Sequence, residues 1–158
     1  MGNHSPANQE TAVAWQGIHH VALVTPDLDA TIHFYRDVLG MRLTVILPAT
    51  GGRGRHAFLS PGGEGLGLHF FEVPDAELRN AWEMIETLQA SFLPGAFQHI
   101  AFTLPDEATA LALRERMEAH GVTMTDVNDL GRLRNFLFPD NNGILLEAIW
   151  PQAESVSK

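Results

Sequence analysis

The stretch that decides the fold is Gly17-Ile18-His19-His20-Val21-Ala22-Leu23-Val24-Thr25-Pro26-Asp27, because a weaker copy of it follows later in the chain. The copy is Ala96-Phe97-Gln98-His99-Ile100-Ala101-Phe102-Thr103-Leu104-Pro105-Asp106. His20 falls on His99 and Pro26 on Pro105, an offset of 79 residues in a chain of 158. A repeat of this length predicts two similar modules, and a histidine at the same place in each copy suggests one shared site.

The composition limits the class of protein. Hydrophobic residues make up 45% of the 158 residues, which indicates about one globular domain. No apolar run approaches the roughly 20 residues that a membrane-spanning helix needs. The net charge of −9 argues against nucleic acid and anionic membrane as partners, since both bind basic patches. The absence of cysteine fits a cytoplasmic protein and leaves histidine and carboxylate as the metal ligands.

Each half of the chain predicts the same order of elements, β-α-β-β-β. In the first half, Asp27 can cap a helix that ends at Gly40. In the second half, Asp106 can cap a helix that ends near Gly121. The apolar runs predict strands over residues 18–25, 41–47, 56–59 and 66–73, and again over 97–104, 122–125, 133–138 and 144–150, with a turn at 128–131.

These elements predict one α+β domain over residues 16–151, built from modules at 16–73 and 96–151. Residues 1–15 are expected to be a disordered leader and 152–158 a tail. The segment 74–95 belongs to neither copy and is predicted to be a helical insert. The insert can cover the site, pack on a partner subunit or add to the core.

The alternation of side chains along the strands identifies four candidate ligands, because alternate residues of a strand face the same side. His20 and His99 occupy equivalent places in the two first strands. His69 and Glu147 occupy equivalent places in the two last strands. If the four strands line one cavity, three imidazoles and one carboxylate converge, a set that suits Zn, Ni, Fe, Mn or Co.

The other histidines are weaker candidates for a functional role. His19 falls on the strand face opposite His20 and is expected to be structural, and His33 on the first helix is expected to be inert. His56 begins a strand that can line the cavity, so it is a candidate for contacting the substrate or a metal ligand. A lone histidine in an apolar strand is more often a hydrogen-bonded core residue than a ligand. The metal prediction therefore rests on the equivalent places of the four side chains taken together.

Four segments together resemble the vicinal oxygen chelate superfamily, which includes glyoxalase I, fosfomycin-resistance proteins, methylmalonyl-CoA epimerase, extradiol dioxygenases and the bleomycin-resistance proteins. The matching segments are His20-Val21-Ala22-Leu23 with Pro26-Asp27-Leu28, Phe34-Tyr35 through Val38-Leu39-Gly40, His99-Ile100-Ala101-Phe102, and Asp140-Asn141-Asn142-Gly143-Ile144-Leu145-Leu146-Glu147. The resemblance implies paired βαβββ modules, a curled mixed sheet around a divalent metal, and a homodimer.

The resemblance implies that His20, His99 and Glu147 are metal ligands, and that Glu147 also serves as the catalytic base. The fourth ligand position carries His69, where glyoxalase I-like members usually have Glu and epimerase-like members Gln. The implied reaction is that of a glyoxalase-like lyase or isomerase, in which the metal stabilises an enediolate or oxyanion formed from a small substrate with adjacent oxygens.

Two alternatives stay open. An Fe(II) extradiol dioxygenase uses two His and one Glu, but that family usually has a His and a Tyr in its last hairpin, which reads Asp129-Leu130-Gly131-Arg132-Leu133-Arg134-Asn135-Phe136-Leu137-Phe138 here. A non-catalytic drug-binding protein of the bleomycin-resistance type usually lacks the ligand set. Arg53, Arg55, Arg132 and Arg134 are candidates for an anionic substrate by charge alone.

Overall fold

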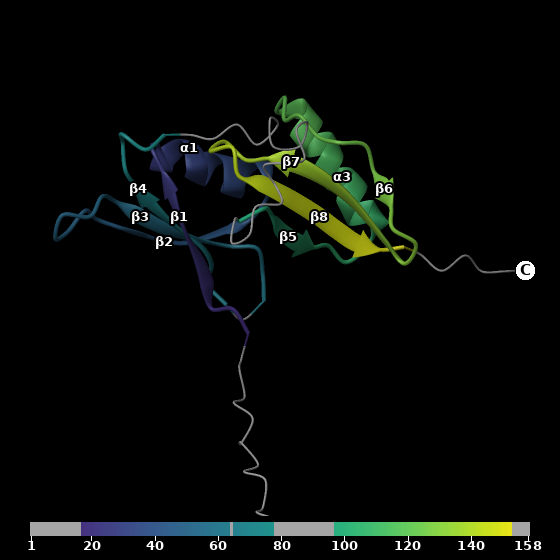
Figure 1. The fold of residues 1–158 in the computed structure, drawn as a ribbon, viewed down its shortest axis with the longest axis horizontal. Coiled ribbons are helices and arrows are strands. Elements are labelled where there is room, and N and C mark those ends of the chain that lie inside the picture. The colour runs from purple at the N-terminus through teal and green to yellow at the C-terminus, as the bar shows by residue number, and fades with distance from the viewer. Residues whose placement is uncertain (1–16, 64, 78–96, 153–158) are drawn as a thin grey trace, which may run out of the picture.

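The computed structural model describes residues 17–63, 65–77 and 97–152, and these form two modules that lie next to each other (Figure 1). Each module is a four-stranded sheet with a helical segment packed against one face. The predicted α+β fold of two βαβββ modules is confirmed. The expected curled sheet is divided into two sheets, one for each module.

The first module has its strands in the order β1-β4-β3-β2. Strand β1 runs parallel to β4, whereas β4–β3 and β3–β2 are antiparallel. The elements are β1 (His20–Thr25), α1 (Leu28–His33), η1 (Phe34–Val38), β2 (Arg42–Leu47), β3 (His56–Ser60) and β4 (Gly67–Glu72). Alternation along these strands sends one set of side chains towards α1 and the other towards an open face that carries His20.

The helical segment of the first module begins where Asp27 accepts a hydrogen bond from Ala30 N. A π-helical turn, η1, follows α1, and Leu39 N donates to Phe34 O across it. Gly40 ends the segment with a φ of 75°, a conformation that glycine adopts without strain. The predicted cap and terminator of this helix are therefore confirmed.

The second module repeats the pattern with the strand order β5-β8-β7-β6. Its elements are β5 (Ile100–Thr103), α3 (Glu107–Ala119), β6 (Asn128–Asp129), β7 (Leu133–Pro139) and β8 (Leu145–Pro151). Asp106 caps α3 by accepting a hydrogen bond from Thr109 N, as the sequence predicts. The parallel pair β5–β8 places Ala101 opposite Glu147, as β1–β4 places Ala22 opposite His69.

One predicted strand is wrong. Residues 122–125 form no strand, and the second strand of the module is instead β6, within the predicted turn at 128–131. Thr125 still bonds to β7 through its backbone N–H, which donates to Leu137 O, and through Oγ1, which accepts from Leu137 N. A side-chain hydroxyl thus replaces part of a strand ladder, which the apolar pattern of residues 122–125 does not reveal.

The core fills the space between each sheet and its helical segment. Fully buried side chains from both modules belong to one cluster, among them Tyr35, Phe70, Phe136 and Trp150. A buried polar network also joins the modules at the β7–β8 turn, where Tyr35 Oη donates to Asp140 Oδ2 at 2.8 Å. In the same network Thr25 Oγ1 donates to Asn142 Oδ1 at 2.8 Å.

The predicted insert at 74–95 lies mostly outside the described residues, as do the leader and most of the tail. No described helix is long and apolar enough to cross a membrane.

Candidate functional site

The first module brings His20 and His69 together on the open face of its sheet. Their ring centroids lie 5.6 Å apart, and the ring of Phe58 on β3 stacks against His69 at 3.8 Å. His56 also reaches this group, with its Nδ1 2.7 Å from His69 Nε2. We call His20 and His69 the first half-site.

His69 is buried, with 7% of its surface exposed. Burial, followed by the nearby imidazoles of His56 and His20, lowers the pKa of His69 below its ordinary value. The neutral imidazole, which is the form that binds a metal ion, is therefore the favoured state of His69 at neutral pH.

The second module brings His99 and Glu147 together at the equivalent place on its own sheet. His99 Nε2 lies 2.9 Å from Glu147 Oε2. Glu147 is 7% exposed, and Asn135 Nδ2 on β7 donates to its other oxygen, Oε1, at 2.5 Å. We call His99 and Glu147 the second half-site. A buried carboxylate with an amide donor on one oxygen and an imidazole at the other is suited to bind a cation or to accept a proton.

The structure thus brings the four predicted ligands together as two pairs on two sheets. Among the described residues, no group of three or more His, Asp or Glu side chains lies close enough to hold a metal ion. Each pair still fits a divalent metal in chemistry, because imidazole nitrogens and a carboxylate oxygen are ligands for Zn and its neighbours. Each half-site supplies two donors of the four.

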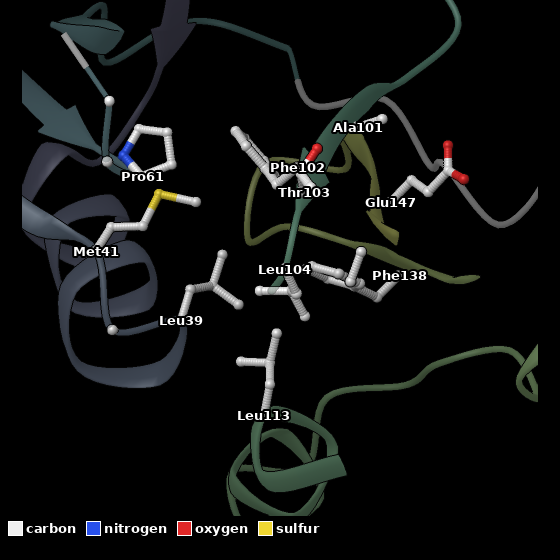
Figure 2. Close-up of a pocket in the computed structure, with 14 residues that line it drawn as sticks. Leu39, Met41, Pro61, Ala101, Phe102, Thr103, Leu104, Leu113, Phe138 and Glu147 are labelled. Carbon is white, nitrogen blue, oxygen red and sulfur yellow. The ribbon is translucent and has the colours of Figure 1, made fainter. Parts of the chain in front are cut away.

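A pocket of about 480 Å³ lies between the modules, and Glu147 is among its lining residues, with its carboxylate pointing away from the apolar side chains (Figure 2). Leu39 and Met41 follow the first helical segment and face Leu104 and Leu113 of the second module across it. The turn at 61–63 and Phe138 complete its walls. The side chains that line the pocket are mostly apolar, while polar atoms still make up a large part of its surface, which is a common composition for a small-molecule site.

Three polar neighbours of the half-sites were missed or misjudged from sequence. Asn135, which bonds Glu147, follows His56 by the same 79 residues that separate His20 from His99, and this offset was the available signal. Gln98 Oε1 lies 2.9 Å from His99 Nδ1. His19, expected to face away, has its Nδ1 2.8 Å from His20 Nδ1.

Two arginines considered for an anionic substrate are engaged elsewhere. Arg55 pairs with Glu72 at 2.7 Å and with Asp29 at 2.9 Å, next to the start of α1. Arg134 pairs with Glu107 at the start of α3. Both arginines therefore tie a helix to its sheet.

The comparisons with known proteins agree with this architecture. A search of curated protein sequences finds no significant match. A glyoxylase/bleomycin resistance protein/dioxygenase domain from Frankia sp. EAN1pec superimposes with a TM-score of 0.70 at 23% identity, over 90% of this chain and 96% of that one. TnmS3, an antibiotic binding protein from Streptomyces sp. CB03234, gives 0.62 at 17% identity over 89% and 100%.

Lactoylglutathione lyase from Agrobacterium tumefaciens gives a TM-score of 0.56 at 21% identity, over 85% of this chain and 93% of that one. At these identities the neighbours establish the fold alone, and they include both enzymes and binding proteins. The family model described as Glyoxalase/Bleomycin resistance protein/Dioxygenase superfamily matches residues 17–148, most of the chain. The chain therefore belongs to the glyoxalase/bleomycin resistance protein/dioxygenase superfamily.

Proposed function

We propose that the chain is a metal-dependent, glyoxalase-like lyase or isomerase that acts on a small substrate with adjacent oxygen atoms. The observation that carries the proposal is the second half-site. There the side chain of Glu147, which is buried, lies 2.9 Å from His99, and Glu147 is among the residues that line a pocket of about 480 Å³. A carboxylate beside a bound substrate is the group that proton-transfer chemistry needs.

One divalent metal ion, Zn, Ni, Fe, Mn or Co, would be held by His20, His69, His99 and Glu147. When bound, such an ion polarises substrate oxygens and stabilises the negative charge that proton removal creates. Burial lowers the pKa of His69, which supports this assignment because a neutral ring needs no deprotonation before it binds.

Glu147 would serve as the base. Asn135 donates to Oε1, so Oε2, the oxygen that faces His99, is the one available to take a proton and return it. A single carboxylate suffices when it removes a proton from one carbon and delivers it to the neighbouring carbon. The pocket would hold the apolar part of the substrate, and His56 would contact either the substrate or His69.

We further propose that the site is completed in a homodimer, with the first half-site from one copy and the second half-site from its partner. The two pairs lie on separate sheets, and the described residues hold no group of three or more donors. Apolar residues on the face that carries His20 are also exposed, Val24 at 50% and Val45 at 38%. A second sheet packed on this face would bury them.

A second candidate is a non-catalytic binding protein for an apolar small molecule in the cytoplasm, without nucleic-acid or membrane partners. The pocket favours it, because most of the side chains that line it are apolar and no described group of three donors surrounds it. The antibiotic binding protein TnmS3 shares the fold.

Metal content and two assays separate these functions. We expect protein dialysed against Ni²⁺, Zn²⁺, Mn²⁺ or Fe²⁺ to retain close to one ion per chain, and His99→Ala and Glu147→Ala to retain none. We expect the Ni²⁺ or Zn²⁺ form to turn over thiohemiacetals of α-ketoaldehydes. Ring-cleavage absorbance from catechols and O₂ with the Fe²⁺ form would instead assign an extradiol dioxygenase. A protein that binds no metal but binds apolar ligands would be the second candidate.

A further inference from the structure

We propose that Asn135 and His56 are positioning residues, which hold Glu147 and His69 in the orientation needed to bind the metal. The proposal rests on the proposed function, because it takes Glu147 and His69 as metal ligands. It adds a second layer of residues that the family match does not assign.

Asn135 is held rigidly beside Glu147. It is 7% exposed on β7, and its Nδ2 donates to Glu147 Oε1 at 2.5 Å. Its own Oδ1 accepts a hydrogen bond from Asn128 Nδ2 at 3.0 Å, which sets the direction of the amide. A flip of the amide would place an acceptor against the carboxylate, so Asn135 has one favourable orientation.

His56 makes the corresponding contact in the first module. Its Nδ1 lies 2.7 Å from His69 Nε2, and its ring stacks on Phe71 at 5.1 Å with an interplanar angle of 10°. The stacking limits rotation of the His56 ring. When His69 Nε2 carries the proton and donates to His56 Nδ1, the hydrogen bond fixes how the His69 ring is turned and leaves its Nδ1 free for a metal.

The two contacts are equivalent in the fold. His56 pairs with Phe71 in the β3–β4 register, and Asn135 pairs with Ile149 in the β7–β8 register. In each module the supporting residue therefore lies diagonally across from the predicted ligand, His69 or Glu147, which is two residues earlier on the last strand. The side chains are chemically unlike and the position of the contact is the same, so this position is the feature that the two modules share.

The first strands repeat the arrangement. His19 Nδ1 lies 2.8 Å from His20 Nδ1, and Gln98 Oε1 lies 2.9 Å from His99 Nδ1. His99 Nε2 is thereby left to face Glu147. All four predicted ligands thus have a polar neighbour, which is what a metal site needs to hold its ligands in place.

The test uses the full-length protein and Co²⁺ as the probe. His56→Phe and Asn135→Leu remove the contacts, and His33→Phe is a matched control on the exposed face of α1. The exchange variants His56→Asn and Asn135→His should keep the contacts, because Oδ1 of Asn can accept from His69 Nε2 and the protonated Nδ1 of His can donate to Glu147 Oε1. Co²⁺ affinity is measured by competition with a chelating dye, ligand geometry by the visible Co²⁺ spectrum, and folding by thermal unfolding without metal.

We expect His56→Phe and Asn135→Leu to weaken Co²⁺ binding by about 10- to 100-fold and to change the spectrum. The exchange variants and the His33→Phe control should bind like the parent. Parent-like affinity and spectrum in both contact-removing variants would overturn the inference, as would exchange variants that bind as weakly as those two. If His56→Phe or Asn135→Leu fails to fold, the exchange variant at the same position decides. Parent-like Co²⁺ binding by that variant supports the inference, and weakened binding overturns it.

Glu147→Ala separates this inference from the proposed function. Co²⁺ binding that is lost in Glu147→Ala and kept in Asn135→Leu overturns the positioning role alone. Co²⁺ binding that is unchanged in Glu147→Ala overturns the proposed site itself.

Discussion

The two modules share a topology and differ in the chemistry that they place on it. The first half-site has two imidazoles, His20 and His69, whereas the second has an imidazole and a carboxylate, His99 and Glu147. The fold therefore repeats the positions of the donors, and the sequence of each copy decides what they can do. In the proposed reaction both modules bind the metal, and the second also supplies the base.

The two junctions between the modules also occupy equivalent places in the fold and differ in chemistry. At the β7–β8 turn, Asp140 accepts a hydrogen bond from Tyr35 Oη, and buried hydrogen bonds occupy the space between the two modules. The equivalent turn at 61–63 instead borders the apolar pocket. Arg114 stands 79 residues after Tyr35, but its guanidinium donates to Thr125 O and covers the Phe136 ring. The junction at the β7–β8 turn is closed by hydrogen bonds between the modules, and we call it the closed junction. The junction at residues 61–63 leaves space for a ligand, and we call it the open junction.

The largest expected effect separates the two half-sites. Glu147→Gln keeps the shape of the side chain but removes the base, so we expect turnover of a thiohemiacetal to fall by about 10²- to 10⁴-fold. His69→Gln keeps the base, so we expect the smaller loss to follow metal affinity and to be recovered at high metal concentration. Steady-state kinetics across a metal titration measures both. Equal, metal-independent losses would contradict the assignment of the base to the second half-site.

The closed junction should contribute more to the free energy of unfolding than the open junction. Tyr35→Phe removes one hydrogen bond from the buried Asp140, so we expect the free energy of unfolding to fall by about 1–3 kcal/mol. Urea denaturation measures the change. An unchanged midpoint would show that Asn142 and Ile144, which also donate to Asp140, satisfy it without Tyr35.

The open junction should respond through binding. Leu113→Trp places a larger apolar side chain in the pocket wall, so we expect KM for a substrate with a large apolar group to rise about tenfold. We expect KM for the smallest thiohemiacetal and the urea midpoint to change little. A uniform rise for all substrates would place the apolar group elsewhere.

The smallest effect concerns how each module anchors its helix. Arg55 pairs with Glu72, which also accepts a hydrogen bond from Leu28 N, whereas within the described part of the chain Arg134 pairs only with Glu107. The hydrogen bond from Arg55 lowers the pKa of Glu72, so this contribution to stability is present above the ordinary carboxyl range and is lost as the pH falls through the lowered pKa. We expect Glu72→Gln to lower the melting temperature at pH 7 and to differ less from the parent below roughly pH 4.3. A difference that stays constant with pH would argue against the charge of Glu72.

Much of the fold follows from local sequence. The repeated His20 and His99 segments, the caps Asp27 and Asp106 and the glycine at position 40 predict both modules. The strand predicted at residues 122–125 failed because Thr125 bonds β7 partly through its hydroxyl, a contact between residues 12 apart in sequence. Apolar periodicity reports burial and does not report which polar group completes a ladder.

The equivalent positions of the four candidate ligands could be predicted from the sequence, and their separation into two pairs could not. Strand phase predicts that His69 and Glu147 occupy equivalent places, and the register agrees. The separation into two pairs depends on how the two sheets pack, for which the sequence carries no local signal. Asn135 and Gln98 are ordinary polar residues by type, and their contacts with Glu147 and His99 emerge from the paired strands.

A mixed-subunit experiment tests most directly the claim that the two half-sites meet between copies. His20→Ala breaks the first half-site and Glu147→Ala breaks the second, so we expect neither protein alone to retain Co²⁺. When the two chains are co-expressed with different tags, half of the dimers should be mixed and each should contain one intact site. We therefore expect about a quarter of the parent's Co²⁺ content and activity in the mixture. A mixture as empty as the two single variants, with mixed dimers present, would contradict the account.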